Sequence, residues 1–195
     1  MRVLAIDPGP TKSGWVSLVN EVPALWGWED NDILIEKLQV TWAQESTLVI
    51  EDIGNYGMAV GRDTFDTCKW MGRFDQAHAT DAIFIPRPTI KTHLCGVASA
   101  KDGNVRQALI DRYGGDAVAV GGKKCQVCKG KGWVGRDHDP CGDCHCDLGA
   151  LNNNDNCGYS THPGPLKGIS GHAWSALAVG VTYFDQVAQV AKEIK

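Results

Sequence analysis

The stretch RVLAIDPGP, residues 2–10, predicts an apolar β-strand that ends in one carboxylate, Asp7, at a turn rich in glycine and proline. Apolar sequence resumes at Ser13–Leu18 and predicts the second strand of a hairpin. A carboxylate held at a rigid sheet edge is suited to a metal ion or a phosphate site. The alternative is an ordinary hairpin in which Asp7 only caps its turn. These residues alone leave both interpretations open.

Further along the chain, the apolar strand Thr47–Ile50 also ends in carboxylates, Glu51 and Asp52. Hydrophobic periodicity predicts further strands at 24–28 and 82–86, and helices within 31–44, 61–80, 104–113 and 169–194. Residues 87–91 are expected to form a loop. Because strands and helices alternate along the chain, we expect an α/β fold.

The composition of the chain changes after residue 114, and Gly, Cys, Asn, Asp and Pro are dense from residue 121 to 168. A chain of 195 residues is long enough for one full core and a small accessory module. We therefore expect residues 1–114 to form the first part of the core, residues 115–168 an insertion, and residues 169–195 a helix that completes the core.

The insertion contains six of the eight cysteines. Cys125 and Cys128 form one C-x2-C pair, and Cys141 and Cys144 form a second pair, with twelve residues between the two pairs. Four thiolates can surround a tetrahedral Zn²⁺ ion, which would stabilise a segment that has no core of its own. A redox-active dithiol is the alternative. The choice of zinc ligands stays open, because further candidates are His145, Cys146, Cys157 and His162.

The formal net charge of −4 excludes a generally basic surface for nucleic acid, so such contacts must come from a local patch. Residues 87–136 contain ten Lys or Arg but only three Asp. Asp7 and Lys12 interrupt the opening segment, so we expect no secretory signal and a cytoplasmic protein. The apolar C-terminal helix has too many polar residues for a membrane span. Cys68 and Cys95 stand apart from the paired cysteines and are expected to be buried thiols.

Three features together resemble the RuvC branch of the RNase H-like nucleases: Ile6-Asp7-Pro8-Gly9 with Gly14 downstream, Glu51 at the end of the fourth predicted strand, and His172 opening the last helix. The resemblance covers residues 1–113 and 169–195, and Ile6–Gly9 is its most specific motif. It implies a five-stranded mixed sheet flanked by helices, in which these three elements hold two Mg²⁺ or Mn²⁺ ions. The cysteine pairs separately resemble the zinc modules of DnaJ-type chaperones.

Carried over residue by residue, the resemblance implies that Asp7 bridges the two ions, Glu51 binds one of them and His172 is a third ligand. Ser175 departs from the family, which normally has Asp there, and a hydroxyl is a weaker ligand for a hard cation. Either Asp52, a water or a substrate phosphate fills this position, or the enzyme is slow or inactive.

Two further groups match family positions that contact DNA. Lys91 and Lys101 resemble residues that contact phosphates of the scissile strand, although they can equally be solvated charges. The family also inserts an aromatic or apolar residue into the junction from the loop after Glu51. Candidates for this wedge, or alternatively for a core or lid role, are Tyr56, Met58 and Phe65.

The resemblance implies a metal-dependent, structure-selective endodeoxyribonuclease that cleaves branched DNA, such as Holliday junctions, forks or flaps, by two-metal phosphodiester hydrolysis. Two symmetric cuts imply a homodimer. The small size and the cysteine-rich insertion suit a phage-encoded member acting in the host cytoplasm, and the histidine ligand favours Mn²⁺ over Mg²⁺. The alternatives are an inactive branched-DNA-binding protein of the same fold, and an ATP-binding enzyme of the actin and sugar-kinase class. That class needs a second phosphate loop, which the sequence lacks.

Overall fold

The computed structural model describes residues 1–40, 42, 46–54, 57, 59–121, 133–134, 139–140 and 164–193. The chain folds as two compact units, residues 1–109 with 169–195, and residues 110–168. The four predicted zinc ligands Cys125, Cys128, Cys141 and Cys144 lie outside the described residues, so the zinc site stays a prediction.

The first unit is built on a five-stranded mixed sheet in the order β3-β2-β1-β4-β5. Its strands are β1 (Arg2–Asp7), β2 (Lys12–Val19), β3 (Val22–Asp30), β4 (Thr47–Asp52) and β5 (Ile83–Pro86). The β1–β2 and β2–β3 pairs are antiparallel, and the β1–β4 and β4–β5 pairs are parallel. The predicted α/β class and the five-stranded mixed sheet are therefore confirmed.

The helices of the chain are α1 (Asn31–Val40), α2 (Arg62–Ala77), α3 (Arg87–Cys95), α4 (Asp102–Arg112) and α5 (Ala173–Glu193). The second unit contains the short π-helical turn η1 (Asp116–Val120) and the two-stranded pair β6 (Trp133–Val134) and β7 (Asp139–Pro140).

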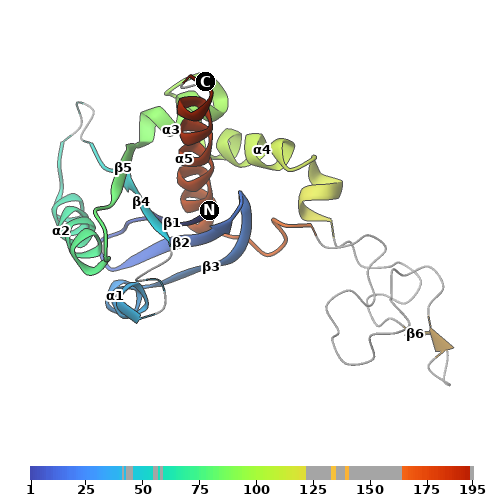
Figure 1. The fold of residues 1–195 in the computed structure, drawn as a ribbon, viewed down its shortest axis with the longest axis horizontal. Helices are drawn as coiled ribbons and strands as arrows, with labels where there is room; N and C mark the ends of the chain where they lie inside the picture. The colour runs from blue at the N-terminus through green and yellow to red at the C-terminus, as the bar shows by residue number, and fades with distance from the viewer. Residues whose placement is uncertain are drawn as a thin grey trace. The chain divides into compact units, whose positions relative to one another are not determined.

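Helices cover both faces of the sheet (Figure 1). On one face, side chains of β1, β2 and β4 pack against α1 and α2 in a buried cluster that includes Leu4, Ile6, Trp15, Leu34, Leu38, Leu48, Ile50 and Phe74. On the other face α5 packs closely, because a Cβ at Gly180 would lie 2.5 Å from Leu18 and 3.1 Å from Ala5. Successive strand residues point to opposite faces, so this alternation decides which side chains lie beside α5.

Two local predictions were wrong. Residues 87–91, expected as a loop, open helix α3, because Pro88 occupies the first turn of a helix, where its missing N–H costs nothing. Cys68 was expected to be buried but is exposed on α2, and Cys95 is only half-buried.

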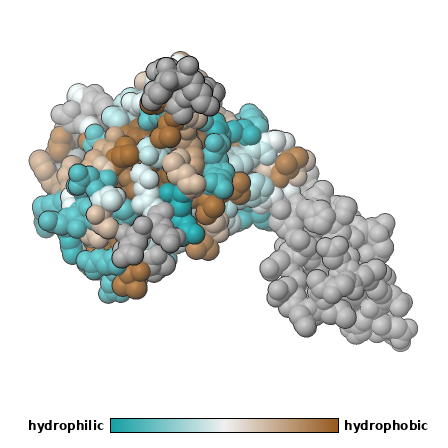
Figure 2. Space-filling model, in the orientation of Figure 1, coloured by the Kyte–Doolittle hydropathy of each residue, from teal (hydrophilic) through white to brown (hydrophobic). Residues whose placement is uncertain are grey.

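The surface shows the mixture that is usual for a folded domain: on the face drawn in Figure 2, hydrophobic and hydrophilic residues are interspersed. Among the described residues, no helix is both long enough and apolar enough to cross a membrane.

Candidate active site

Two carboxylates meet where the parallel strands β1 and β4 end. Ile6 pairs with Ile50 in the parallel register, so the next residues, Asp7 and Glu51, lie at the same level of the sheet. Strand alternation places both on the face that α5 covers. Both residues are nearly buried, with Asp7 9% and Glu51 5% exposed.

His172 lies over the sheet next to Asp7, in the space left by a glycine on the neighbouring strand. Gly14 of β2 pairs with Asp7 on one side and with Trp28 of β3 on the other. A Cβ at Gly14 would lie 2.6 Å from the backbone and the Cβ of His172, so only glycine leaves room for His172 here. The imidazole Nδ1 lies 2.9 Å from Asp7 Oδ2, and its ring stacks on Trp28 with centroids 6.0 Å apart.

Ser175 lies one turn further along, in the first turn of α5. Its side chain lies close enough to Asp7 to oppose the rise in the pKa of that carboxyl, and it stands where the resemblance implies a metal ligand. Ser175 contributes a neutral hydroxyl there rather than a second carboxylate.

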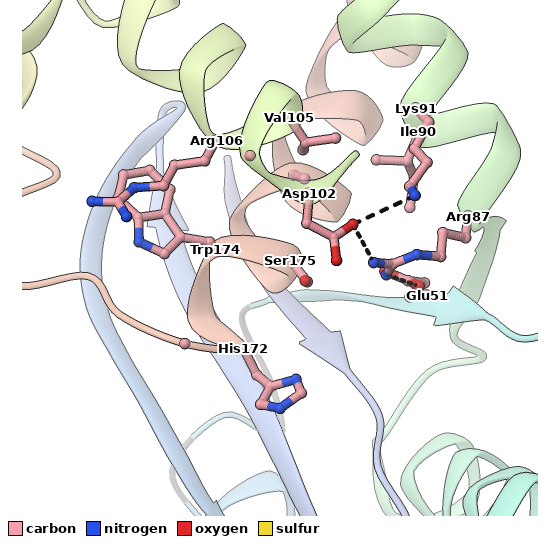
Figure 3. A pocket seen from close by; sticks show the side chains of 13 residues that line it. Glu51, Arg87, Ile90, Lys91, Asp102, Val105, Arg106, His172, Trp174 and Ser175 are labelled. Carbon is pink, nitrogen blue, oxygen red and sulfur yellow. Dashed lines mark hydrogen bonds and ion pairs between the residues drawn. The ribbon is translucent and has the colours of Figure 1, made fainter. Parts of the chain in front are cut away.

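Arg87 joins Glu51 to the start of α4 (Figure 3). Its Nη1 lies 2.6 Å from Glu51 Oε1, and its Nη2 lies 2.7 Å from Asp102 Oδ1. Lys91, one turn further along α3, approaches the same Asp102 oxygen at 3.4 Å. The guanidinium is therefore the cation that balances Glu51 in this structure.

These groups border a cleft of about 430 Å³. Figure 3 shows Glu51, Arg87, Lys91 and Asp102 on one side of it and His172 with Ser175 on another. Arg106 of α4 also lines the cleft, and its guanidinium lies over the ring of Trp174 at 4.8 Å. The cleft thus combines two carboxylates, Glu51 and Asp102, with three basic side chains, Arg87, Lys91 and Arg106.

Burial controls the charge state of the two carboxylates. Burial raises the pKa of Asp7, although the hydrogen bond and the charge of His172 oppose the shift. Burial and then the negative charge of Asp7 raise the pKa of Glu51 to about 7, and Arg87 opposes this shift only in part. Two buried carboxylates that repel each other favour an added cation between them.

No protein-family model and no curated protein matches the chain. Among solved structures it is similar to RuvC of Thermus thermophilus, with a TM-score of 0.56, 12% identity, and coverage of 97% of this chain and 96% of that chain. It is also similar to T. thermophilus RuvC in complex with a Holliday junction substrate, with a TM-score of 0.53, 12% identity, and coverage of 94% and 93%. The chain has a RuvC-like fold.

In this RuvC-like fold the donors around Asp7 suit a hard divalent cation. Two buried carboxylates, an imidazole and a hydroxyl are oxygen and nitrogen ligands of the kind that Mg²⁺ and Mn²⁺ take. However, no three His, Cys, Asp or Glu side chains in the described part of the chain lie close enough together to hold a metal as they stand. In this structure Arg87 contacts Glu51 and His172 contacts Asp7, each at a carboxylate oxygen that a metal ion would otherwise bind.

The RuvC-like fold brings some predicted site residues together and leaves others apart. Asp7, Glu51, His172, Ser175 and Lys91 gather at the cleft or beside it. Lys101 is exposed just before α4 and does not line the cleft. Asp52 does not line it either, since strand alternation turns it away from Glu51. Of the candidate wedge residues, Phe65 on α2 is 59% exposed, and Tyr56 and Met58 lie outside the described residues.

Sequence reasoning did not assign a role to Arg87, Asp102 or Arg106 at the site. For Arg87 a signal was present: it precedes Lys91 by four residues, a spacing that aligns two side chains on one helix face. Interpreting the segment as a loop removed that information. Asp102 and Arg106 share the same spacing on α4, but no local pattern indicates that α4 borders the same cleft as Glu51.

Proposed function

We propose that the chain is a metal-dependent endonuclease that cleaves branched DNA such as Holliday junctions, forks or flaps. The observation that carries the proposal is the pair of buried carboxylates, Asp7 and Glu51, on one face of the sheet, with His172 bonded to Asp7. The RuvC-like fold supports the choice of nuclease, and the junction bound to T. thermophilus RuvC supports branched DNA as the substrate.

Asp7, Glu51 and His172 would hold two Mg²⁺ or Mn²⁺ ions, which when bound supply an activated water and offset the charge of the reacting phosphate. Lys91 and Arg106 line the cleft and would bind the phosphates on either side of the reacting one. The contact of Lys91 with Asp102, whose side chain is 72% exposed, is 3.4 Å long, so we expect Lys91 to exchange it for a phosphate. Arg87 would balance Glu51 until metal binds.

A second candidate function is binding of branched DNA without cleavage. It is favoured by Ser175, which gives Asp7 a hydroxyl in place of a carboxylate, and by Arg87, which occupies Glu51. In this case the cleft would bind phosphates through its basic side chains alone.

The first experiment measures cleavage of labelled four-way, forked and linear duplex DNA in Mg²⁺ and in Mn²⁺. We expect branched DNA to be cut, and Asp7→Asn to slow cutting by at least about 100-fold, because metal stabilisation of the transition state amounts to several kcal/mol. Asp81→Asn, which changes an exposed carboxylate away from the cleft, is the matched control and should cut normally. Binding without cutting in either metal would favour the second candidate. Cutting that survives Asp7→Asn would reject the site.

We also propose that the chain acts as a homodimer, because resolving a four-way junction needs two symmetric cuts. Sedimentation of the purified protein should then give twice the 21.1 kDa mass of the chain. A monomer that cuts both strands of a junction would contradict this.

A further inference from the structure

Trp28 is a large apolar side chain left open to solvent beside the candidate active site. It lies on the edge strand β3 and is 56% exposed. It pairs across the sheet with Gly14, which in turn pairs with Asp7. Trp28 and Asp7 therefore flank His172 on the same face of the sheet.

Lys12 supplies a cation at the same place. It precedes Gly14 by two residues on β2 and pairs with Asp30 of β3. Its side chain therefore points to the same face of the sheet as His172. Its Nζ lies over the Trp28 ring, 5.2 Å from the centroid. Its ion pair with Asp30 is 3.4 Å long, and both side chains are largely exposed, at 41% and 57%. Such a pair costs little to break, so Lys12 can turn to an anion.

An exposed aromatic ring beside a weakly held cation is the combination that binds a nucleotide. The ring stacks on the base, which works for any base because each has a flat π face, and the cation binds the phosphate. The stacked His172 ring already restricts the rotation of the Trp28 indole. A base that stacks on the indole therefore loses little free energy to ordering that side chain. Paired bases within a duplex keep their stacking partners, so the site suits a base that is unpaired, as at the branch point of a junction or in a flap.

We infer that Trp28 and Lys12 form a nucleotide-binding subsite beside the cleft, in which the indole stacks on an unpaired base of the DNA substrate and Lys12 binds its phosphate. The inference rests on the proposed function, since it assumes a DNA substrate. It goes beyond that function by assigning the β3 edge to the contact with the unpaired base.

The test is equilibrium binding in EDTA, which separates binding from cleavage. The probes are fluorescein-labelled single-stranded DNA, a four-way junction and linear duplex. Trp28→Ala should weaken binding of single strand and junction by about 5- to 100-fold, the usual effect of losing one stacked base, and duplex by much less. Trp28→Phe should keep most of the wild-type affinity, because the smaller aromatic ring can still stack on a base. Lys12→Gln should make the negative slope of log K against log salt less steep by about 0.7 to 0.9.

Leu25→Ala is the matched control, since Leu25 is 58% exposed on the same strand but on the opposite face by alternation. It should bind every probe as wild type does. A fluorescent base analogue placed at single positions of the junction should be quenched at one position by wild type and Trp28→Phe, and not by Trp28→Ala.

The outcomes separate this inference from the proposed function. Equal binding of all probes by wild type and Trp28→Ala, with normal cleavage of junctions, would overturn the subsite and leave the nuclease. A Trp28→Ala protein that binds normally but cuts slowly would also overturn it, and would make Trp28 a support for His172. Wild-type protein that binds no DNA at all would overturn the proposed function itself.

Discussion

At the scale of single residues, Ser175 is the position where the chain departs from what its resemblance implies. Its hydroxyl lies near Asp7, whose pKa is already raised by burial. A carboxylate at Ser175 would add a third negative charge beside Asp7 and Glu51. In the absence of metal that charge repels the other two, and with metal bound it is a stronger ligand than a hydroxyl.

We therefore expect Ser175→Asp to act in opposite directions with and without metal. In EDTA it should lower the free energy of unfolding by about 1 to 3 kcal/mol, the usual effect of adding a poorly compensated charge at a partly buried position. With excess Mn²⁺ its melting temperature should rise by several degrees more than that of wild type, because a ligand that binds only the folded state stabilises it. Thermal unfolding with and without Mn²⁺ measures both effects.

Ser175→Asn is the control for this experiment, since it has the size of Asp without the charge. If Mn²⁺ raised the melting temperature equally in Ser175→Asp and Ser175→Asn, position 175 would not contact a metal. It would then favour the inactive binding protein over the nuclease.

At the scale of elements, the site depends on how closely α5 approaches the sheet. Gly14 pairs with Asp7 on β1 and lies directly beneath His172, the residue that precedes α5. A methyl group there would lie 2.6 Å from the His172 backbone. Backbone cannot rotate away as a flexible side chain can, so the start of α5 would have to shift.

We expect Gly14→Ala to destabilise the protein by about 1 to 3 kcal/mol, as overpacking does, and to reduce DNA cleavage by moving His172 away from Asp7. Gly72→Ala is the matched control, because Gly72 lies inside α2, where an added Cβ would meet no atom within 4 Å. That change should raise stability by about 0.5 to 1 kcal/mol, since alanine favours a helix over glycine. Urea unfolding of both variants measures the difference. Normal stability and cleavage in Gly14→Ala would contradict the close approach.

Local sequence predicted the elements that present the site, and missed the contacts between them. Asp7 and Glu51 could be assigned to the site because each ends an apolar strand and because the resemblance implies both as ligands. The parallel pairing of β1 and β4, which puts them side by side, is a finding of the structure. The links from Arg87 to Asp102 and from Trp28 to His172 join residues far apart in sequence. They depend on the register of β3 and on the placement of α3 and α4, which no local periodicity contains.

At the scale of the whole molecule, the chain consists of two compact units of different amino-acid composition. The unit of residues 1–109 and 169–195 has a conventional apolar core around the sheet. The unit of residues 110–168 contains the cysteine-rich segment, whose short sequence provides few large apolar residues to bury. A segment of that kind usually requires a metal or disulfides for stability, and the C-x2-C spacing favours zinc.

We therefore expect the purified protein to contain about one zinc ion per chain, bound by Cys125, Cys128, Cys141 and Cys144, as measured by elemental analysis. Cys125→Ser should lose most of the zinc, because three thiolates leave the tetrahedral site incomplete. Cys68→Ser should keep it, since Cys68 is a free, exposed cysteine on α2 and serves as the matched control. Protein without zinc whose thiols react freely in the native state would contradict the site, and a reversible disulfide among these cysteines would favour the redox dithiol instead. Because the carboxylates at Asp7 and Glu51 belong to the other unit, stripping zinc should leave binding of Mn²⁺ at the cleft unchanged.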